Sequence, residues 1–143
     1  MFATQFEPPF EDEFVQTGIA RFTFRHFPHL GPASEAAALA AECAADQDAF
    51  FPYHDALFER QAQGLSSAEL DGAARAAGLD LDRFSDCLDS RTHQDALMAG
   101  AEEARRLGIA STPFVLVNGV RVPLSTAGEF LALLRALAAQ AGN

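Results

Sequence analysis

Hydrophobic residues recur every three to four positions along most of this chain, a period typical of amphipathic helices. We predict a first helix from Phe2 to Gln16, interrupted at Pro8-Pro9 and ended by Gly18. Residues 32–107 show only helical spacing, so we expect several short helices there and no strand. A last helix follows Thr126, and its single apolar face is made by Phe130, Leu133, Leu134 and Leu137.

Capping residues and glycines divide the helical stretch 32–107. We predict that Pro32 lies at the start of its first helix and that Gly64 and Gly78 end later ones. The remaining predicted signals are helix N-caps, namely Asp48, the capping box of Ser66 with Glu69, and Ser90 for the helix that ends at Leu107.

Two segments show strand patterns instead. Residues 19–27 alternate with a period of two, which predicts a strand with Phe22 and Phe24 on its buried face. The apolar run Phe114–Val117 reaches Asn118-Gly119, a strong hairpin signal, and returns as Val120–Val122. Proline is usually confined to the start of a strand, so Thr112-Pro113 marks the entry to this hairpin, and we expect its peptide bond to be cis.

Length and composition predict one domain, residues 1–143. The chain is 49% hydrophobic with 13 Phe, which is enough apolar material for a core. A net charge of −10 argues against nucleic-acid and anionic-membrane partners, because both need a basic surface. The N-terminal residues lack the basic start and apolar block of a signal peptide, and no run is long enough for a membrane span.

The two cysteines, Cys43 and Cys87, are too far apart for a zinc pattern. Two interpretations stay open, a pair of buried thiols or a structural disulfide. His26 and His29 form a His-x-x-His at the exit of the predicted strand, where their rings need not converge. We therefore predict no metal site and no cofactor.

The predicted order is helix, strand, helical block, antiparallel hairpin, helix. Several stretches carry a resemblance in this order, including Phe14-Val15-Gln16-Thr17-Gly18, Phe27-Pro28-His29-Leu30-Gly31-Pro32, Ala41-Glu42-Cys43-Ala44, Phe50–Phe58, Phe84–Ser90 and Leu107–Pro113. Taken together, the chain resembles the DsbA-like thiol–disulfide oxidoreductases. The resemblance implies an α/β, thioredoxin-like fold with an all-helical insertion at about 32–107.

The chain departs from this family in one respect. Members begin with a central strand that ends in Cys-x-x-Cys, and the 143 residues contain neither the motif nor an earlier strand. We expect a truncated or mis-started reading frame, a shortened chain, or a non-catalytic relative. No catalytic residue is therefore assigned, and we expect little or no redox activity from this chain.

The resemblance also implies roles for residues that are present. Thr112 and Pro113 match the family's cis-proline loop, which offers backbone groups to extended peptide or protein thiol substrates. Some members join cysteines at the positions of Cys43 and Cys87. The family implies a periplasmic or extracytoplasmic location. The alternatives are a non-catalytic peptide-binding module, which could form a homodimer through exposed strand edges, and a glutathione-using relative.

Overall fold

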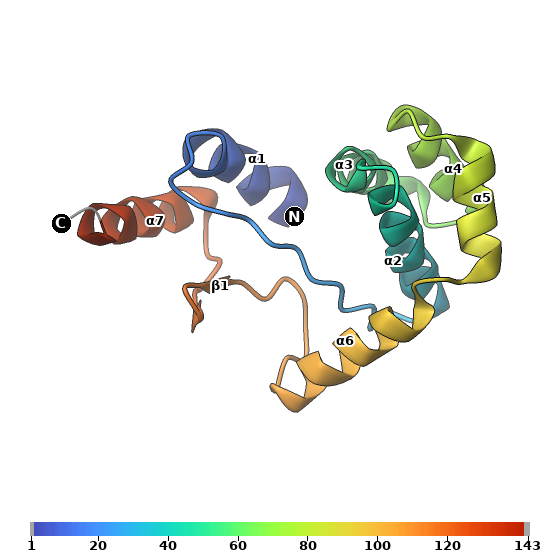
Figure 1. Ribbon diagram of the computed structural model, residues 1–143. Helices are drawn as coiled ribbons and strands as arrows, with labels where there is room; N and C mark the ends of the chain where they lie inside the picture. Colours follow the sequence, from blue (N-terminus) through green and yellow to red (C-terminus); the bar gives the residue numbers. More distant parts are fainter. Residues whose placement is uncertain (1, 142–143) are drawn as a thin grey trace. The chain divides into compact units, whose positions relative to one another are not determined.

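The computed structural model describes residues Phe2–Ala141, which divide into two compact units. The helical unit is Arg25–Ala110. The terminal unit combines the residues up to Phe24 with those from Ser111 onward, so it is built from both ends of the chain. Figure 1 shows the helices of the first unit in blue-green to orange and those of the second in dark blue and red.

The helical unit contains five α-helices and no strand among its described residues. The helices are α2 (Pro32–Ala45), α3 (Phe50–Arg60), α4 (Ser67–Ala76), α5 (Leu81–Ser90) and α6 (Gln94–Arg106), with a short 3-10 turn at Gln61–Gln63. This arrangement confirms the predicted all-helical block. Small residues let α2, α3 and α4 approach closely, since Ala40, Ala44, Ala73 and Ala74 are all fully buried.

Two large aromatic residues complete the core of the helical unit. Tyr53 is 0% exposed and Phe84 is 1% exposed, with ring centroids 5.5 Å apart. The Tyr53 hydroxyl donates to the carbonyl of Leu70 at 3.4 Å, and burial raises the pKa of the phenol, as does the nearby negative charge of Asp71. The core of the helical unit therefore combines two rings with alanines and with Leu57, Leu70 and Leu79.

The predicted helix caps have mixed outcomes. Ser66 accepts from the backbone N–H of Glu69, so this N-cap is confirmed. Asp48 is not a cap: it adopts a left-handed conformation with φ of 57°, and Ala49 precedes α3 instead. Ser90 is also wrong as a cap, because it is the last residue of α5 and its hydroxyl donates to the carbonyl of Cys87.

A side-chain amide ties the segment after α2 to the start of α5. The Gln47 Nε2 donates to the Asp80 carbonyl at 3.2 Å, and the Gln47 Oε1 accepts from the Asp80 N–H at 2.9 Å. The Asp80 carboxylate in turn accepts from the backbone N–H groups of Asp82 and Arg83. Asp80 is thus the N-cap of α5 and is itself held by Gln47.

In the terminal unit, the first predicted helix is present but irregular. A π-helical turn (Phe2–Phe6) leads into α1 (Glu7–Phe10), and a second π-helical turn (Glu11–Val15) follows. Pro8-Pro9 lies inside α1, and proline removes backbone donors from the regular helical ladder. Gly18, with φ of 75°, ends the segment as predicted.

The C-terminal half of this unit is a hairpin followed by a helix. Strands β1 (Leu116–Val117) and β2 (Val120–Arg121) pair antiparallel across Asn118-Gly119, both with positive φ. The helix α7 (Ala127–Ala141) begins after Thr126, whose hydroxyl accepts from the Glu129 N–H. The buried core of the unit is rich in phenylalanine and comprises Phe6, Phe10, Phe14, Val122, Phe130 and Leu134.

The predicted strand at residues 19–27 does not form. No strand is assigned there, and within the described residues the only sheet is the pair of β1 and β2. A period of two indicates that one face of the segment is buried. An extended segment can bury that face by packing alone, without pairing to a neighbouring strand. Phe22 does so, since its ring lies edge-on to Phe10 with centroids 5.6 Å apart.

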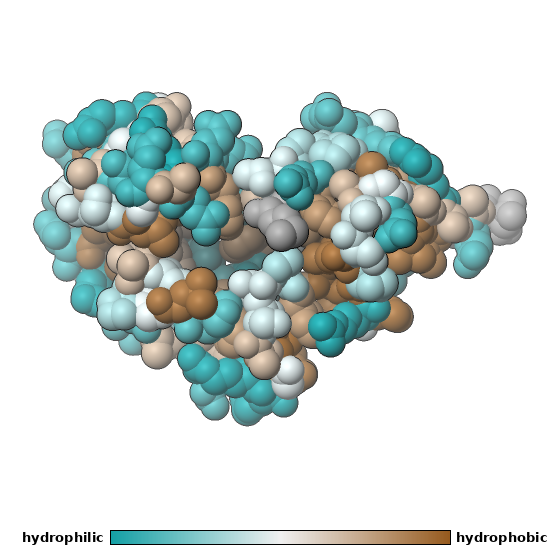
Figure 2. All heavy atoms as spheres, turned by 180° about the vertical axis from the view of Figure 1, so that it is seen from behind, coloured by the Kyte–Doolittle hydropathy of each residue, from teal (hydrophilic) through white to brown (hydrophobic). Residues whose placement is uncertain are grey.

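Hydrophobic side chains remain at the surface of the terminal unit. Figure 2 shows brown atoms on its surface, at the right of that view. Leu116 and Val120, which lie on the hairpin, are 52% and 67% exposed, and Ile19 is 59% exposed.

Candidate functional site

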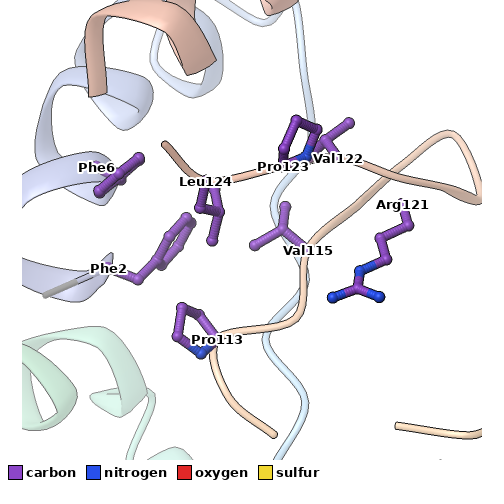
Figure 3. Close-up of a pocket in the computed structure, with 8 residues that line it drawn as sticks. All are labelled: Phe2, Phe6, Pro113, Val115, Arg121, Val122, Pro123 and Leu124. Carbon is purple, nitrogen blue, oxygen red and sulfur yellow. The ribbon is translucent and has the colours of Figure 1, made fainter. Parts of the chain in front are cut away.

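A pocket of about 470 Å³ lies within the terminal unit, beside the entry to the hairpin. Its walls come from the first helical segment and from the hairpin region, and they are formed by Phe2, Phe6, Pro113, Val115, Arg121, Val122, Pro123 and Leu124. Figure 3 shows Phe2 and Phe6 projecting from the helix toward Leu124. The pocket is therefore mostly apolar, the usual character of a site for small molecules or side chains.

Pro113 forms one wall of this pocket, and the Thr112–Pro113 peptide bond is cis, as predicted. Both residues are exposed. The Val122 N–H donates to the Val115 carbonyl at 3.1 Å, which continues the hairpin pairing toward Pro113. The hairpin region thus carries the proline loop and one wall of the pocket on one continuous piece of backbone.

Among the described residues that line the pocket, Arg121 is the single charged one. Its guanidinium lies over the ring of Phe114, 4.7 Å from the ring centroid, a cation–π contact that fixes the side chain. In Figure 3 this guanidinium lies on the opposite side of the pocket from Phe2 and Phe6. The pocket therefore presents an apolar end and a cationic end.

Cys43 and Cys87 form a disulfide that joins α2 to α5 inside the helical unit. This settles the alternatives left open by the sequence. Cys43 is 1% exposed, whereas Cys87 is half-buried near the surface. No other cysteine is present in the sequence, so the chain holds no free thiol.

His26 and His29 contact different groups, as expected for a strand exit. The His29 Nδ1 lies 2.9 Å from the Phe27 carbonyl, and the His26 Nε2 lies 3.2 Å from Glu42 Oε1. Burial, together with the neighbouring charge of His54, lowers the pKa of His26 to about 4. His26 is therefore neutral near pH 7, and its contact with Glu42 is not an ion pair.

Sequence reasoning found Thr112 and Pro113 but missed the rest of the pocket. Phe2 and Phe6 were assigned only to a helix, because nothing local indicates that they meet residues more than a hundred positions later. It also missed a second cluster in the helical unit. Asp46 contacts both Cys87 and His93, which lie 41 and 47 positions further along the chain.

A family model described as thioredoxin matches residues 1–136, nearly the whole chain. The chain belongs to the thioredoxin family. Its structure is thus a mostly helical member of this fold with a small two-stranded sheet in the described residues. The resemblance drawn from the motifs is confirmed at the level of the thioredoxin-like family.

Two groups of relatives were found. The chain is 25% identical over 125 residues to disulfide bond formation protein D of Bacillus subtilis, covering 82% of the chain and 56% of the relative. It is 35% identical over 119 residues to the Na(+)/H(+) antiporter NhaA 1 of Salinispora arenicola, covering 82% of the chain and 18% of the relative. A third relative, the antiporter NhaA of Herminiimonas arsenicoxydans, is 37% identical over 102 residues, or 71% of the chain and 16% of the relative.

The lengths of these relatives matter for their interpretation. The chain spans less than a fifth of the antiporter relatives and about half of the disulfide-formation relative. None of the helices in residues 2–141 is both long enough and apolar enough to cross a membrane. The matched region in each case is therefore one part of a longer protein.

Proposed function

We propose that this chain is the substrate-binding part of a thiol–disulfide oxidoreductase of the thioredoxin family. The observation that carries the proposal is the apolar pocket beside cis-Pro113, on a hairpin whose entry is exposed. An extended peptide lies along such backbone and places one side chain in the pocket. Similarity to disulfide bond formation protein D supports the same class of activity.

The reactive dithiol would come from a segment outside these 143 residues. Disulfide exchange needs an accessible thiolate, and the two cysteines present are joined to each other in the helical unit. The predicted central strand that ends in Cys-x-x-Cys, which these 143 residues do not contain, would supply the missing thiolate. Its absence also accounts for a sheet of only two short strands in the described residues.

An insulin-reduction assay tests whether the reactive dithiol lies outside these 143 residues. The purified 143-residue chain should reduce insulin no faster than the uncatalysed thiol control, because it has no free cysteine. Substantial turnover by this chain would contradict the proposal. Extension of the chain with its native flanking sequence should restore turnover if that sequence supplies a Cys-x-x-Cys.

Peptide binding tests the pocket directly. Fluorescence anisotropy with a labelled peptide that carries a leucine or phenylalanine reports binding to the 143-residue chain without any redox step. Val115→Thr puts a hydroxyl into the apolar wall and should weaken binding roughly 5-fold to 10-fold. Val120→Thr is the matched control, because this hairpin valine is 67% exposed and lies outside the pocket wall. Equal effects of both variants on the peptide affinity would show that the pocket does not bind the peptide side chain, which would contradict the proposal.

The antiporter relatives favour a second candidate, in which this chain is the thioredoxin-family part of a longer transport protein. The supporting observation is 35% identity over 119 residues with only 18% of the relative covered. An antibody raised against the chain distinguishes the two by immunoblot of cell fractions. A band far larger than a 143-residue polypeptide, found with the membranes, supports the second candidate, and a small band in the soluble fraction opposes it.

A further inference from the structure

We propose that reduction of the Cys43–Cys87 disulfide creates a zinc site where α2, α5 and α6 meet. The ligands are the Cys87 thiolate, the His93 imidazole and the Asp46 carboxylate. This inference concerns the helical unit alone and does not depend on the proposed substrate pocket.

The three ligand atoms are already close together. The His93 Nε2 lies 2.7 Å from Asp46 Oδ2, and the Cys87 Sγ lies 3.7 Å from the same oxygen. All three atoms lie within 4.8 Å of one another. Zinc bond lengths of about 2.0–2.3 Å place tetrahedral ligands roughly 3.3–3.7 Å apart, so small side-chain movements suffice.

Each ligand belongs to a different helix. Asp46 is the C-cap of α2, Cys87 lies in the last turn of α5, and His93 is the N-cap of α6. The C-terminal end of a helix carries partial negative charge, so the end of α2 favours a bound cation. Nitrogen, sulfur and oxygen ligands together suit zinc, and water would complete the tetrahedron.

An ion from solvent can reach Asp46 and His93 but not Cys43. The side chains of Asp46 and His93 are 49% and 23% exposed, which allows an ion and its water to enter. Cys43 is 1% exposed and lies among the alanines of the core. Cys87 is therefore the sulfur that faces the site, while Cys43 stays in the core.

The disulfide excludes this metal site, because a thiolate and not a disulfide sulfur is the ligand. A dithiol reductant transfers two electrons and two protons to the disulfide and itself becomes a disulfide. A phosphine reductant supplies the two electrons and takes an oxygen atom from water to become a phosphine oxide, and the same water supplies the two thiol protons. Zinc then displaces the thiol proton of Cys87 and takes the Nε2 lone pair of neutral His93, and the one released proton goes to solvent. The oxidised protein thus binds no metal here, and the reduced protein does.

Cobalt(II) is the spectroscopic probe, since thiolate ligation gives a near-ultraviolet charge-transfer band. The band should appear in the phosphine-reduced protein and in Cys43→Ala, and it should be absent from the oxidised protein. Cys87→Ala is the matched control, because it also loses the disulfide but lacks the ligand. Absence of the band in both the reduced protein and Cys43→Ala would overturn the proposal.

Zinc affinity gives an independent readout by competition with a chromophoric chelator. Adding His93→Ala to Cys43→Ala should weaken zinc binding at least about 10-fold, whereas adding His29→Ala should not change it. Zinc should also raise the melting temperature of Cys43→Ala and not that of Cys87→Ala. Equal affinity with and without His93, or a Cys43→Ala variant that stays unfolded in zinc, would contradict the site.

Discussion

The two units are stabilised in different ways. The helical unit is one continuous stretch of chain, with a core of alanines around Tyr53 and Phe84 and a disulfide between two of its helices. The terminal unit joins residues from both ends of the chain around clustered phenylalanines, and its only described strands have two residues each. The first unit is therefore built from one continuous segment of the chain, and the second depends on contacts between the two ends of the chain.

The largest expected effect is the loss of a core ring. Phe84→Ala should lower the free energy of unfolding by up to about 5 kcal/mol, because it removes a fully buried ring and leaves a cavity. Hydrogen exchange read by mass spectrometry should show the loss of protection in α2–α5. Phe130→Ala, which removes a 3% exposed ring from the other core, should instead affect α7. Equal losses in both units for both variants would show that the units unfold together.

Removal of the disulfide should have the next largest effect. The bond closes a loop across a sequence separation of 44, and the loop-entropy model gives about 4 kcal/mol for such a loop. Urea unfolding of the Cys43→Ala/Cys87→Ala double variant measures this loss. Reductant should destabilise the natural sequence and leave the double variant unchanged. A loss below about 1 kcal/mol would mean that packing alone holds the helical unit together.

Acid should weaken the helical unit through His26. Its folded pKa of about 4 lies below the ordinary 6.5, because burial disfavours the imidazolium. Between these values the unfolded chain binds more protons, so stability is full above pH 6.5 and falls by about 3 kcal/mol as the pH drops to 4. Urea unfolding across this range should show a flatter profile for His26→Gln. His29→Gln is the control, and the same flattening there would assign the effect elsewhere.

The smallest expected effect lies on the surface of the terminal unit. Arg135 Nε and Nη2 donate to the two carboxylate oxygens of Glu13 at 2.5 Å and 2.6 Å. These hydrogen bonds lower the pKa of Glu13. Arg135→Gln should raise that pKa toward the ordinary value in an NMR titration. Arg106→Gln, which removes the same charge from the helical unit, should leave the Glu13 titration curve in place.

Sequence reasoning succeeded where the signal is local. The capping of α4 by Ser66, the Asn118-Gly119 turn and the cis bond before Pro113 were all predicted from a few neighbouring residues. The wrong predictions also have local causes. Asp48 and Ser90 are good capping residues by type, but the first lies in a left-handed turn and the second remains inside α5.

The features that sequence reasoning missed depend on distance along the chain. A period of two at residues 19–27 predicted a strand, but pairing requires a neighbour that the pattern itself cannot specify. Of the pocket residues, Pro113 was predicted as a site residue, whereas Phe2 and Arg121 carry no local sign of a shared site. The same holds for Asp46 and His93, whose meeting depends on the packing of three helices.

The contact between Gln47 and Asp80 restricts which residues can be substituted at position 47. The Gln47 side chain satisfies both the N–H and the carbonyl of one residue 33 positions away, as a neighbouring peptide group would. Glutamate would keep the acceptor and lose the donor, and leucine would lose both. Homologous sequences that keep this junction should therefore retain glutamine, or the shorter amide asparagine with a local shift, whichever residue stands at position 80, because both contacts are to its backbone.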